Sequence, residues 1–194
     1  MYRITAVCLG NICRSPMAEA VLRSRIDAAG LSQPVLVDSA GTDGWHIDED
    51  ADPRALTTLR SAGYDLTHAG RQITTEWFLE PGRPDLLLTM DASNYTTVID
   101  LAPDDPSRGR VHMLRSFDPS LAGLTPGDPR LDVPDPWYGA HDGFVEVLAM
   151  IEAAADGLVA RLPTMLDAFA PRLTAECDAP PSGSNGLDTS GHRP

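Results

Sequence analysis

Lysine is absent from this sequence, and all fifteen of its basic residues are arginine. They stand against 28 acidic residues, so the formal net charge is −13. A chain this acidic repels polyanions, which excludes nucleic acids and anionic membrane surfaces as expected partners. No apolar run reaches the length of a membrane-spanning helix, and the N-terminus lacks the apolar core of a signal peptide.

Cysteine is scarce as well, with three residues in a chain of 194. Three thiols cannot form a disulfide framework, so we expect the reducing cytoplasm as the compartment, although secretion without a signal peptide stays open. The sequence has no internal repeat and no cluster of residues with metal-ligand spacing. We therefore expect neither a metal nor a cofactor.

The most informative stretch is Cys8-Leu9-Gly10-Asn11-Ile12-Cys13-Arg14-Ser15, which is followed by Pro16. A buried strand is predicted over residues 3–8, directly before this loop. A helix is predicted after it, with Ser15 as the N-cap, Pro16 in the first helical position and Glu19 in the first turn. A strand, a tight loop and a helix N-terminus together make an anion site.

The spacing within this loop has a chemical reason. Five residues between Cys8 and Arg14 can wrap once around a tetrahedral oxyanion, with backbone amides and the Arg14 guanidinium as donors. The sulfur of Cys8 then lies behind the central phosphorus, in a place that favours a thiolate, and the Ser15 hydroxyl can donate to it. Gly10 and Asn11 tolerate the positive φ angles that such a loop needs. The alternative is a buried cysteine at a strand end with an incidental arginine.

Hydrolysis of a phosphate ester in two steps needs a carboxyl that acts first as an acid and then as a base. Five Asp-Pro pairs are present, so the pair alone indicates only a loop turn. Asp135 stands out because Trp137-Tyr138-Gly139 follows it, and two aromatic rings beside an acid could form a slot for a phenyl ring. The alternative is that both rings are partly buried loop residues.

Strand-like and helix-like segments alternate along the chain. Strands are predicted over residues 3–8, 35–37, 86–88 and 111–114, and helices over 15–30, 53–62, 92–101 and 144–169, the last with a kink or break at Pro163. Residues 118–136 are rich in proline, glycine and aspartate and form a long excursion. This alternation predicts an α/β fold, a four-stranded parallel sheet with helices on both faces, with its ligand site at the carboxyl ends of the strands.

The chain is expected to be one domain over residues 1–170, followed by a disordered tail over 171–194. Residues 180–186 have the composition of a linker. Cys177 lies in this tail, and we expect it to be an idle thiol.

Beyond the loop, the chain resembles the low-molecular-weight protein tyrosine phosphatases over about residues 1–165. The motifs that carry the resemblance, besides the loop, are Ser39-Ala40-Gly41-Thr42, Trp45-His46, Asp52-Pro53-Arg54-Ala55, His68 with Arg71-Gln72, Met90-Asp91 with Asn94, and Asp135-Pro136-Trp137-Tyr138-Gly139. The resemblance implies a Rossmann-like fold of the phosphotyrosine phosphatase I type. It also implies that Cys8 is the nucleophile, that Arg14 binds the phosphoryl group and that Asp135 is the acid and base.

The resemblance assigns further residues to the site. Trp45, Trp137 and Tyr138 would wall the cleft, although the family usually has Tyr where Trp137 stands. Ser39 and His68 would hold the loop open through Asn11. The remaining loop positions would contact the phosphoryl group or the substrate; they are Leu9, Gly10, Asn11, Ile12, Cys13 and Ser15. Gly70 replaces an alanine that is common in the family.

The predicted function is hydrolysis of phosphotyrosine in proteins through a phosphocysteine intermediate, with a cognate tyrosine kinase as a further candidate partner. Protein-arginine phosphatases are similar but have Thr where Ile12 stands. Related arsenate reductases use downstream cysteines, which are absent between Cys13 and Cys177. A non-catalytic phosphotyrosine-binding module would usually lack Cys8 or Asp135. Cys13 is either a small apolar filler or a partner for Cys8 under oxidation.

Overall fold

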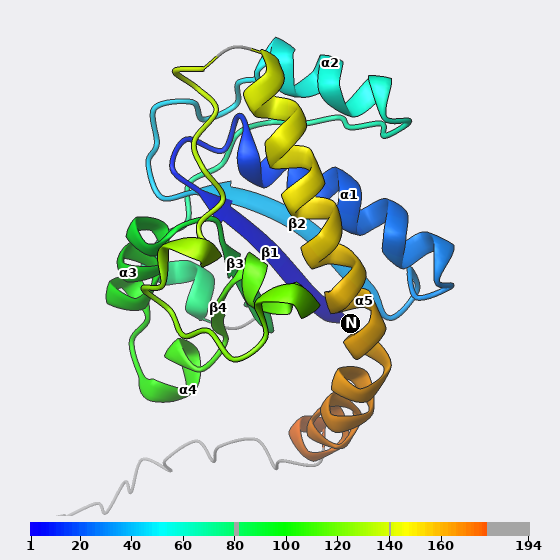
Figure 1. The fold of residues 1–194 in the computed structure, drawn as a ribbon. Helices are drawn as coiled ribbons and strands as arrows, with labels where there is room; N and C mark the ends of the chain where they lie inside the picture. Colours follow the sequence, from blue (N-terminus) through cyan, green and yellow to red (C-terminus); the bar gives the residue numbers. More distant parts are fainter. Residues whose placement is uncertain (80–81, 140, 178–194) are drawn as a thin grey trace, which may run out of the picture.

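The computed structural model describes residues 1–79, 82–139 and 141–177. At its centre is a parallel sheet in the order β2-β1-β3-β4 (Figure 1). The strands are β1 (Tyr2–Cys8), β2 (Val35–Gly41), β3 (Leu86–Thr89) and β4 (Val111–Met113). The helices are α1 (Arg14–Ala28), α2 (Pro53–Ser61), α3 (Ala92–Leu101), α4 (Asp105–Arg108) and α5 (His141–Cys177). The predicted fold class, a four-stranded parallel sheet with helices on both faces, is confirmed.

The two faces of the sheet bury different apolar clusters. Ile4, Ala6 and Cys8 of β1 belong to the larger cluster, which α1 and α5 complete on one face of the sheet. Val7 belongs to the smaller cluster on the other face, which includes Val98 of α3. This alternation follows the period of two along a strand. Both faces of β1 are therefore buried, as expected for a central strand of a parallel sheet.

The strand order places β1 between β2 and β3. The chain leaves β1 to form β2 on one side and later returns to form β3 on the other, which makes the end of β1 a topological switch point. In open parallel sheets such a point opens a crevice at the carboxyl ends of the strands, where ligands bind. Cys8 is the last residue of β1, so the Cys8 loop lies at this crevice, as expected from the sequence.

Helix α1 begins earlier than predicted. Its N-cap is Cys13, without a side-chain capping bond, and Arg14 is its first residue. The prediction that Ser15 is the N-cap is therefore wrong, and Glu19 does not lie in the first turn. The reason is that the Ser15 hydroxyl is used elsewhere, because it donates to the carbonyl oxygen of Ala40 at 3.2 Å and contacts Cys8.

Asp-Pro pairs start helical turns in several places, which explains their abundance. Asp52 caps α2 by accepting from the backbone N–H of Arg54. Asp118 and Asp128 do the same for two 3₁₀ turns in the long excursion. Turns of 3₁₀ helix occur at Thr75–Phe78, Leu114–Phe117, Pro119–Leu121 and Pro129–Leu131, and none of these nor α4 was predicted. Each spans only three or four residues, which is too short for a helical period of apolar residues to indicate it.

Helix α5 runs without interruption through Pro163, so of the predicted kink or break, the break is wrong and the kink stays a prediction. The helix continues because Leu162 is buried and Phe169 packs on the core, with its ring 5.1 Å from that of Tyr2 in an edge-to-face arrangement. It extends to Cys177, beyond the expected domain boundary at residue 170. The rest of the predicted tail, residues 178–194, lies outside the described residues.

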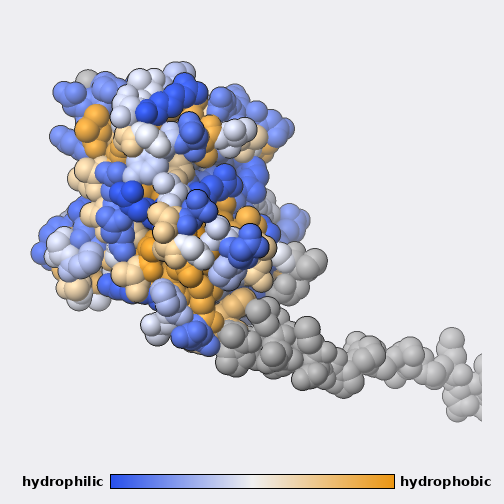
Figure 2. All heavy atoms as spheres, turned by 90° about the vertical axis from the view of Figure 1, so that its right-hand side faces the viewer, coloured by the Kyte–Doolittle hydropathy of each residue, from blue (hydrophilic) through white to orange (hydrophobic). Residues whose placement is uncertain are grey.

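Figure 2 shows the face covered by α1 and α5, where hydrophilic side chains surround smaller apolar patches. Among the half-buried residues that pack on the core are Val159 and Met165 of α5. Within the described part of the chain, no helix is both long and apolar enough to cross a membrane.

Candidate active site

The thiol of Cys8 is buried at the floor of a cavity of about 210 Å³. Its sulfur lies 3.0 Å from the Ser15 hydroxyl and accepts a hydrogen bond from the backbone N–H of Asn11 at 3.3 Å. Asn11 has a φ of +56°, the left-handed conformation expected in this loop, whereas Gly10, for which it was also expected, does not have a positive φ. That conformation turns the amide of Asn11 toward the sulfur, so the buried sulfur has a backbone donor.

The Asn11 side chain holds the loop in this shape. Its amide Nδ2 donates to the hydroxyls of Ser15 at 2.9 Å and Ser39 at 3.0 Å, and its Oδ1 accepts from the backbone N–H of Arg71 at 2.8 Å. His68 Nε2 lies 2.7 Å from the backbone oxygen of Asn11. A carbonyl oxygen only accepts, so this nitrogen carries the hydrogen. Ser39 and His68 thus both contact Asn11, as the resemblance implied.

A buried carboxylate anchors this set of bonds, and the sequence did not indicate it. The Ser39 hydroxyl donates to Glu19 Oε2 at 2.5 Å, while Glu19 Oε1 pairs with Arg23 at 2.7 Å. With its hydrogen directed at Glu19, Ser39 offers a lone pair to Asn11. Burial lowers the pKa of His68, so its neutral form is favoured.

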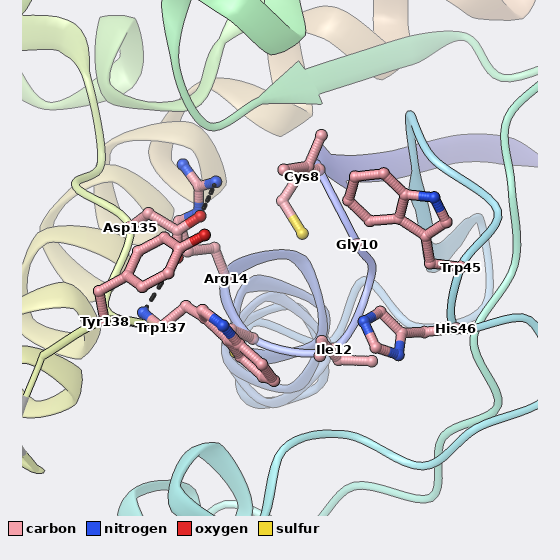
Figure 3. Close-up of a pocket in the computed structure, with 11 residues that line it drawn as sticks. Cys8, Gly10, Ile12, Arg14, Trp45, His46, Asp135, Trp137 and Tyr138 are labelled. Carbon is pink, nitrogen blue, oxygen red and sulfur yellow. Dashed lines mark hydrogen bonds and ion pairs between the residues drawn. The ribbon is translucent and has the colours of Figure 1, made fainter.

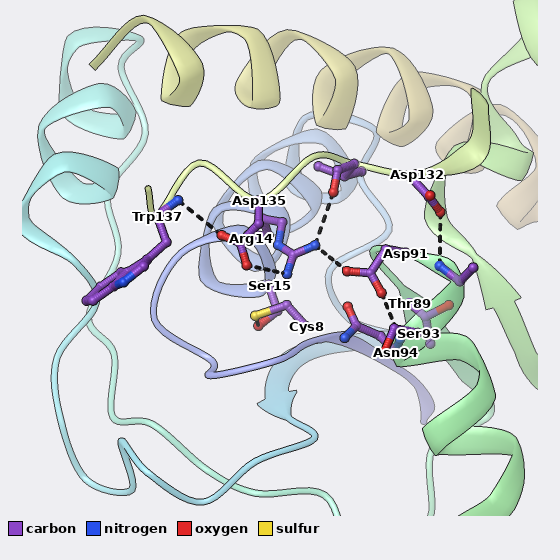
Figure 4. Close-up of polar contacts among 12 residues, drawn as sticks. Cys8, Arg14, Ser15, Thr89, Asp91, Ser93, Asn94, Asp132, Asp135 and Trp137 are labelled. Carbon is purple, nitrogen blue, oxygen red and sulfur yellow. Dashed lines mark hydrogen bonds and ion pairs between the residues drawn. The ribbon is translucent and has the colours of Figure 1, made fainter. Parts of the chain in front are cut away.

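Arg14 reaches into the site from the first turn of α1 (Figure 4). Its Nη1 donates to Asp91 at 2.5 Å and to the backbone oxygen of Val133 at 3.1 Å. Its Nη2 donates to Asp135 at 2.8 Å. Although burial acts to lower the pKa of Arg14, the charges of Cys8, Asp135 and Asp91 outweigh it and raise that pKa. The guanidinium is therefore fixed on one edge and presents its other edge to the cavity.

Asp91 was not predicted to have a role. It ends the turn after β3 and caps α3 by accepting from the backbone N–H of Asn94 at 2.7 Å. One carboxylate thus fixes both the start of α3 and the orientation of Arg14. The available signal was the Met90-Asp91 motif with Asn94, which the resemblance included without assigning Asp91 a role.

Asp135 faces Arg14 across the mouth of the cavity (Figure 3). Its second oxygen, Oδ1, accepts from the backbone N–H of Trp137 at 3.1 Å. Trp137 and Tyr138 both line the cavity, and Tyr138 is 94% exposed. Trp137 is 41% exposed and so is still partly buried, as the alternative interpretation had it, whereas Tyr138 is not.

The opposite wall comes from the loop after β2. Trp45 is 71% exposed and His46 lies beside it (Figure 3). The His46 ring is 6.2 Å from that of Trp137, and its Nδ1 bonds Glu49 at 2.6 Å. Aromatic side chains thus flank the thiol on both sides. His46 was not predicted to line the site.

The predicted loop residues divide into two groups. The cavity is lined by Cys8, Leu9, Gly10, Ile12, Cys13, Arg14, Trp45, His46, Asp135, Trp137 and Tyr138. Asn11 and Ser15 do not line it, because both are fully buried behind the loop and bond the sulfur or its neighbours. Burial, with the nearby charges of Asp52 and Cys8, raises the pKa of the Cys13 thiol.

Two glycines allow the walls to approach each other. A Cβ on Gly41 would lie 2.7 Å from the backbone oxygen of Leu9, so only glycine lets β2 pass so close to the loop. A Cβ on Gly70 would lie 2.0 Å from the backbone oxygen of His46. Replacement of the family's common alanine by Gly70 therefore permits the Trp45 loop to pack as it does.

The geometry of this site agrees with three comparisons. The family of low molecular weight phosphotyrosine protein phosphatases matches residues 3–167. The low molecular weight protein-tyrosine-phosphatase of Streptomyces coelicolor is 52% identical over 159 residues, which are 82% of this chain and 92% of that protein. The crystal structure of a protein tyrosine phosphatase from Entamoeba histolytica is 31% identical, has a TM-score of 0.75 and covers 84% of this chain and 98% of its own. The chain therefore belongs to the low molecular weight phosphotyrosine protein phosphatase family.

A neighbour with a different named activity has the same fold. The structure of the YwlE arginine phosphatase, a protein of Bacillus subtilis, is 28% identical with a TM-score of 0.69. It covers 83% of this chain and 95% of its own. Choice of substrate must therefore depend on details of the site and not on the fold.

Proposed function

We propose that this chain hydrolyses phosphotyrosine in proteins through a phosphocysteine intermediate, with Cys8, Arg14 and Asp135 as its catalytic residues. The observation that carries the proposal is their placement around one cavity. The Cys8 sulfur lies at its floor, Arg14 and Asp135 meet at its edge, and aromatic rings form both walls.

In the first step, the Cys8 thiolate attacks phosphorus and the bond to the tyrosine oxygen breaks. The electron pair of that bond goes to the leaving oxygen, and protonated Asp135 gives it a proton. Arg14 and the loop amides bind the phosphoryl oxygens, where negative charge is held in the transition state. The Asn11 amide stabilises the thiolate before attack and when it leaves again. The Ser15 hydroxyl does the same once its single hydrogen turns from the Ala40 carbonyl oxygen to the sulfur.

In the second step, Asp135 has become a carboxylate and takes a proton from water. The water oxygen attacks phosphorus, the bond from phosphorus to sulfur breaks, and its electron pair returns to Cys8. The products are inorganic phosphate and the original thiolate. One carboxyl therefore serves both steps, and each step returns it to the protonation state that the other needs.

The walls favour an aryl phosphate. Trp45 and Trp137 offer flat apolar surfaces on which a phenyl ring can stack, and Ile12 adds an aliphatic contact at the rim. Phosphoarginine is the second candidate, because a named arginine phosphatase shares the fold. Its guanidinium would gain a polar partner from Thr at position 12, which this chain lacks.

We further propose phosphotyrosine-containing proteins as the partners, a cognate tyrosine kinase as the enzyme that supplies them, and the cytoplasm as the compartment. Cys8 and Cys13 are both free thiols in the structure. A thiolate nucleophile works only where it stays reduced, which supports a reducing compartment.

The test is turnover of phosphotyrosine, phosphoarginine and phosphoserine peptides side by side, with and without EDTA. We expect phosphotyrosine to be hydrolysed with the highest kcat/KM and EDTA to leave the rate unchanged. A higher kcat/KM for phosphoarginine would overturn the proposed substrate class, and loss of activity in EDTA would overturn the metal-free mechanism.

A further inference from the structure

Arg54, the second residue of α2, connects two segments that are distant in sequence. Its Nε and Nη2 bond the two carboxylate oxygens of Asp52 at 3.0 and 2.9 Å. Its Nη1 donates to the backbone oxygens of Trp137 at 3.2 Å and Gly139 at 3.4 Å. Its guanidinium also lies 5.4 Å from the centre of the Trp137 ring and 4.8 Å from that of Phe144. One side chain thus contacts the backbone and the ring of the segment that follows Asp135.

We propose that Arg54 is a positioning residue for Asp135, an assignment that rests on the proposed function. Asp135 Oδ1 accepts from the backbone N–H of Trp137, so the orientation of the carboxyl depends on where that backbone lies. Arg54 fixes this backbone through the carbonyl of the same residue. Its bonds therefore reach the carboxyl through a single residue, Trp137, whose C=O meets Arg54 and whose N–H meets Asp135.

The other end of this connection is tied to the loop that holds the nucleophile. Asp52 is buried, and its backbone N–H donates to the backbone oxygen of Ile12 at 2.7 Å. Its side chain caps α2. Arg54 is thus bonded to Asp52, which is itself bonded to the Cys8 loop. Through these contacts the position of the Asp135 carboxyl is fixed relative to the Cys8 thiol.

The arrangement needs arginine. A planar guanidinium can meet a carboxylate with two parallel bonds, donate to two carbonyl oxygens and stack on an indole at the same time. A lysine ammonium is a point charge with three donors and cannot do all of these together. Arg54→Lys therefore keeps a cation for buried Asp52 while removing the geometry that holds Trp137.

The first measurement is the burst-phase rate of phosphorylation with phosphotyrosine and with p-nitrophenyl phosphate. A displaced acid slows the reaction of a substrate whose leaving oxygen needs a proton. Arg54→Lys should therefore lower the burst-phase rate with phosphotyrosine by about 10–100-fold and the rate with p-nitrophenyl phosphate much less. Arg60→Lys, on the exposed surface of the same helix, is the matched control and should change neither. Equal losses for both substrates would overturn the proposal, because a general structural role predicts them.

The second measurement is the same substitution in an Asp135→Asn background. If Arg54 acts through Asp135, Arg54→Lys should not lower the burst-phase rate with phosphotyrosine any further once the acid has been removed. An undiminished loss in that background would assign Arg54 a role independent of Asp135 and overturn the proposal.

The third measurement does not depend on catalysis. Backbone hydrogen exchange over residues 133–139 should be faster in Arg54→Lys, while exchange in the core strand β1 stays the same. Unchanged exchange over 133–139 would overturn the proposal even if the variant were less active. Should the wild type fail to hydrolyse phosphotyrosine, the proposed function falls by itself, and the exchange result still decides whether Arg54 positions this segment.

Discussion

Arg14 and Asp135 form an ion pair at the edge of the cavity, with Nη2 2.8 Å from Oδ2. The same edge of the guanidinium is the one that a phosphoryl group would bind, because Asp91 and Val133 occupy the other edge. In the proposed mechanism, an incoming phosphoryl group competes with Asp135 for Arg14 and releases the carboxyl toward the leaving oxygen. Binding and activation of the acid are coupled by this pair.

Cys8→Ser should abolish turnover while phosphate and substrate still bind, because Arg14 and the loop amides remain in place. A hydroxyl is a far weaker nucleophile than a thiolate at neutral pH. Calorimetric titration with inorganic phosphate and a phosphotyrosine peptide measures binding, and a steady-state assay measures turnover. Activity close to that of the wild type in the purified variant would exclude Cys8 as the nucleophile.

Mild peroxide should inactivate the protein reversibly. Peroxide oxidises the Cys8 thiolate to a sulfenic acid, and the Cys13 thiol then forms a disulfide with it and releases water. Because the pKa of Cys13 is raised, the second step should accelerate as pH increases. Intact-mass analysis should show the loss of two hydrogens, which dithiothreitol restores.

The matched controls for this oxidation are Cys13→Ser and Cys177→Ser. Cys13→Ser should lose reversibility and accumulate sulfinic and sulfonic acid, whereas Cys177→Ser should behave as the wild type does. Only sulfinic and sulfonic acid in the wild type would refute a protective role for Cys13.

Ile12→Thr should move selectivity from phosphotyrosine toward phosphoarginine. Ile12 lines the cavity and also packs in the larger apolar cluster, so its side chain is only 8% exposed. The added hydroxyl offers a polar partner to a guanidinium and removes apolar contact with a phenyl ring. The ratio of the two kcat/KM values should change by about 1–3 kcal/mol in free energy. Ile12→Val is the control, and an unchanged ratio in Ile12→Thr would show that position 12 serves only the core.

Acid should destabilise the fold through His68. Because burial lowers the pKa of His68, the unfolded chain binds a proton there more readily than the folded chain does. The free energy of unfolding should therefore decrease as pH falls from about 6.5 until it passes the folded pKa. His68→Gln keeps an N–H donor for Asn11 but does not titrate, so its urea unfolding should depend less on pH over this range. Identical pH dependence in both proteins would contradict this assignment.

Much of the fold could be predicted from the sequence because apolar periodicity carries it. The four strands and α3 follow from their apolar patterns, and the ends of α1 and α2 follow from Gly30 and Gly63, which have φ angles of +70° and +85°. The break expected at Pro163 is absent because tertiary packing of the apolar residues after it outweighs the lost hydrogen bond. Rules that predict helix ends from neighbouring residues in the sequence do not include such tertiary packing.

The site was predictable where one short segment carries the chemistry, as in the Cys8 loop. It was not predictable where function depends on contacts between distant segments. The sequence indicates no role in the site for Glu19, Arg54 or Asp91, although Arg54 and Asp91 lie in family motifs. Each of the three contacts a partner at least 20 residues away. Only the folded chain brings these charges to the loop.

The most direct test of this account is the burst-phase rate of Asp135→Asn with a poor and a good leaving group. Phenol has a pKa of about 10, so phosphotyrosine needs a proton on its leaving oxygen. Loss of the acid should lower its rate by about 10²–10⁴-fold, whereas p-nitrophenyl phosphate should lose much less. With p-nitrophenyl phosphate, the burst should persist while the steady state falls, because the carboxylate that activates water is gone. Equal burst-phase losses for both substrates would contradict the role of Asp135 as the acid and with it the proposed mechanism of hydrolysis.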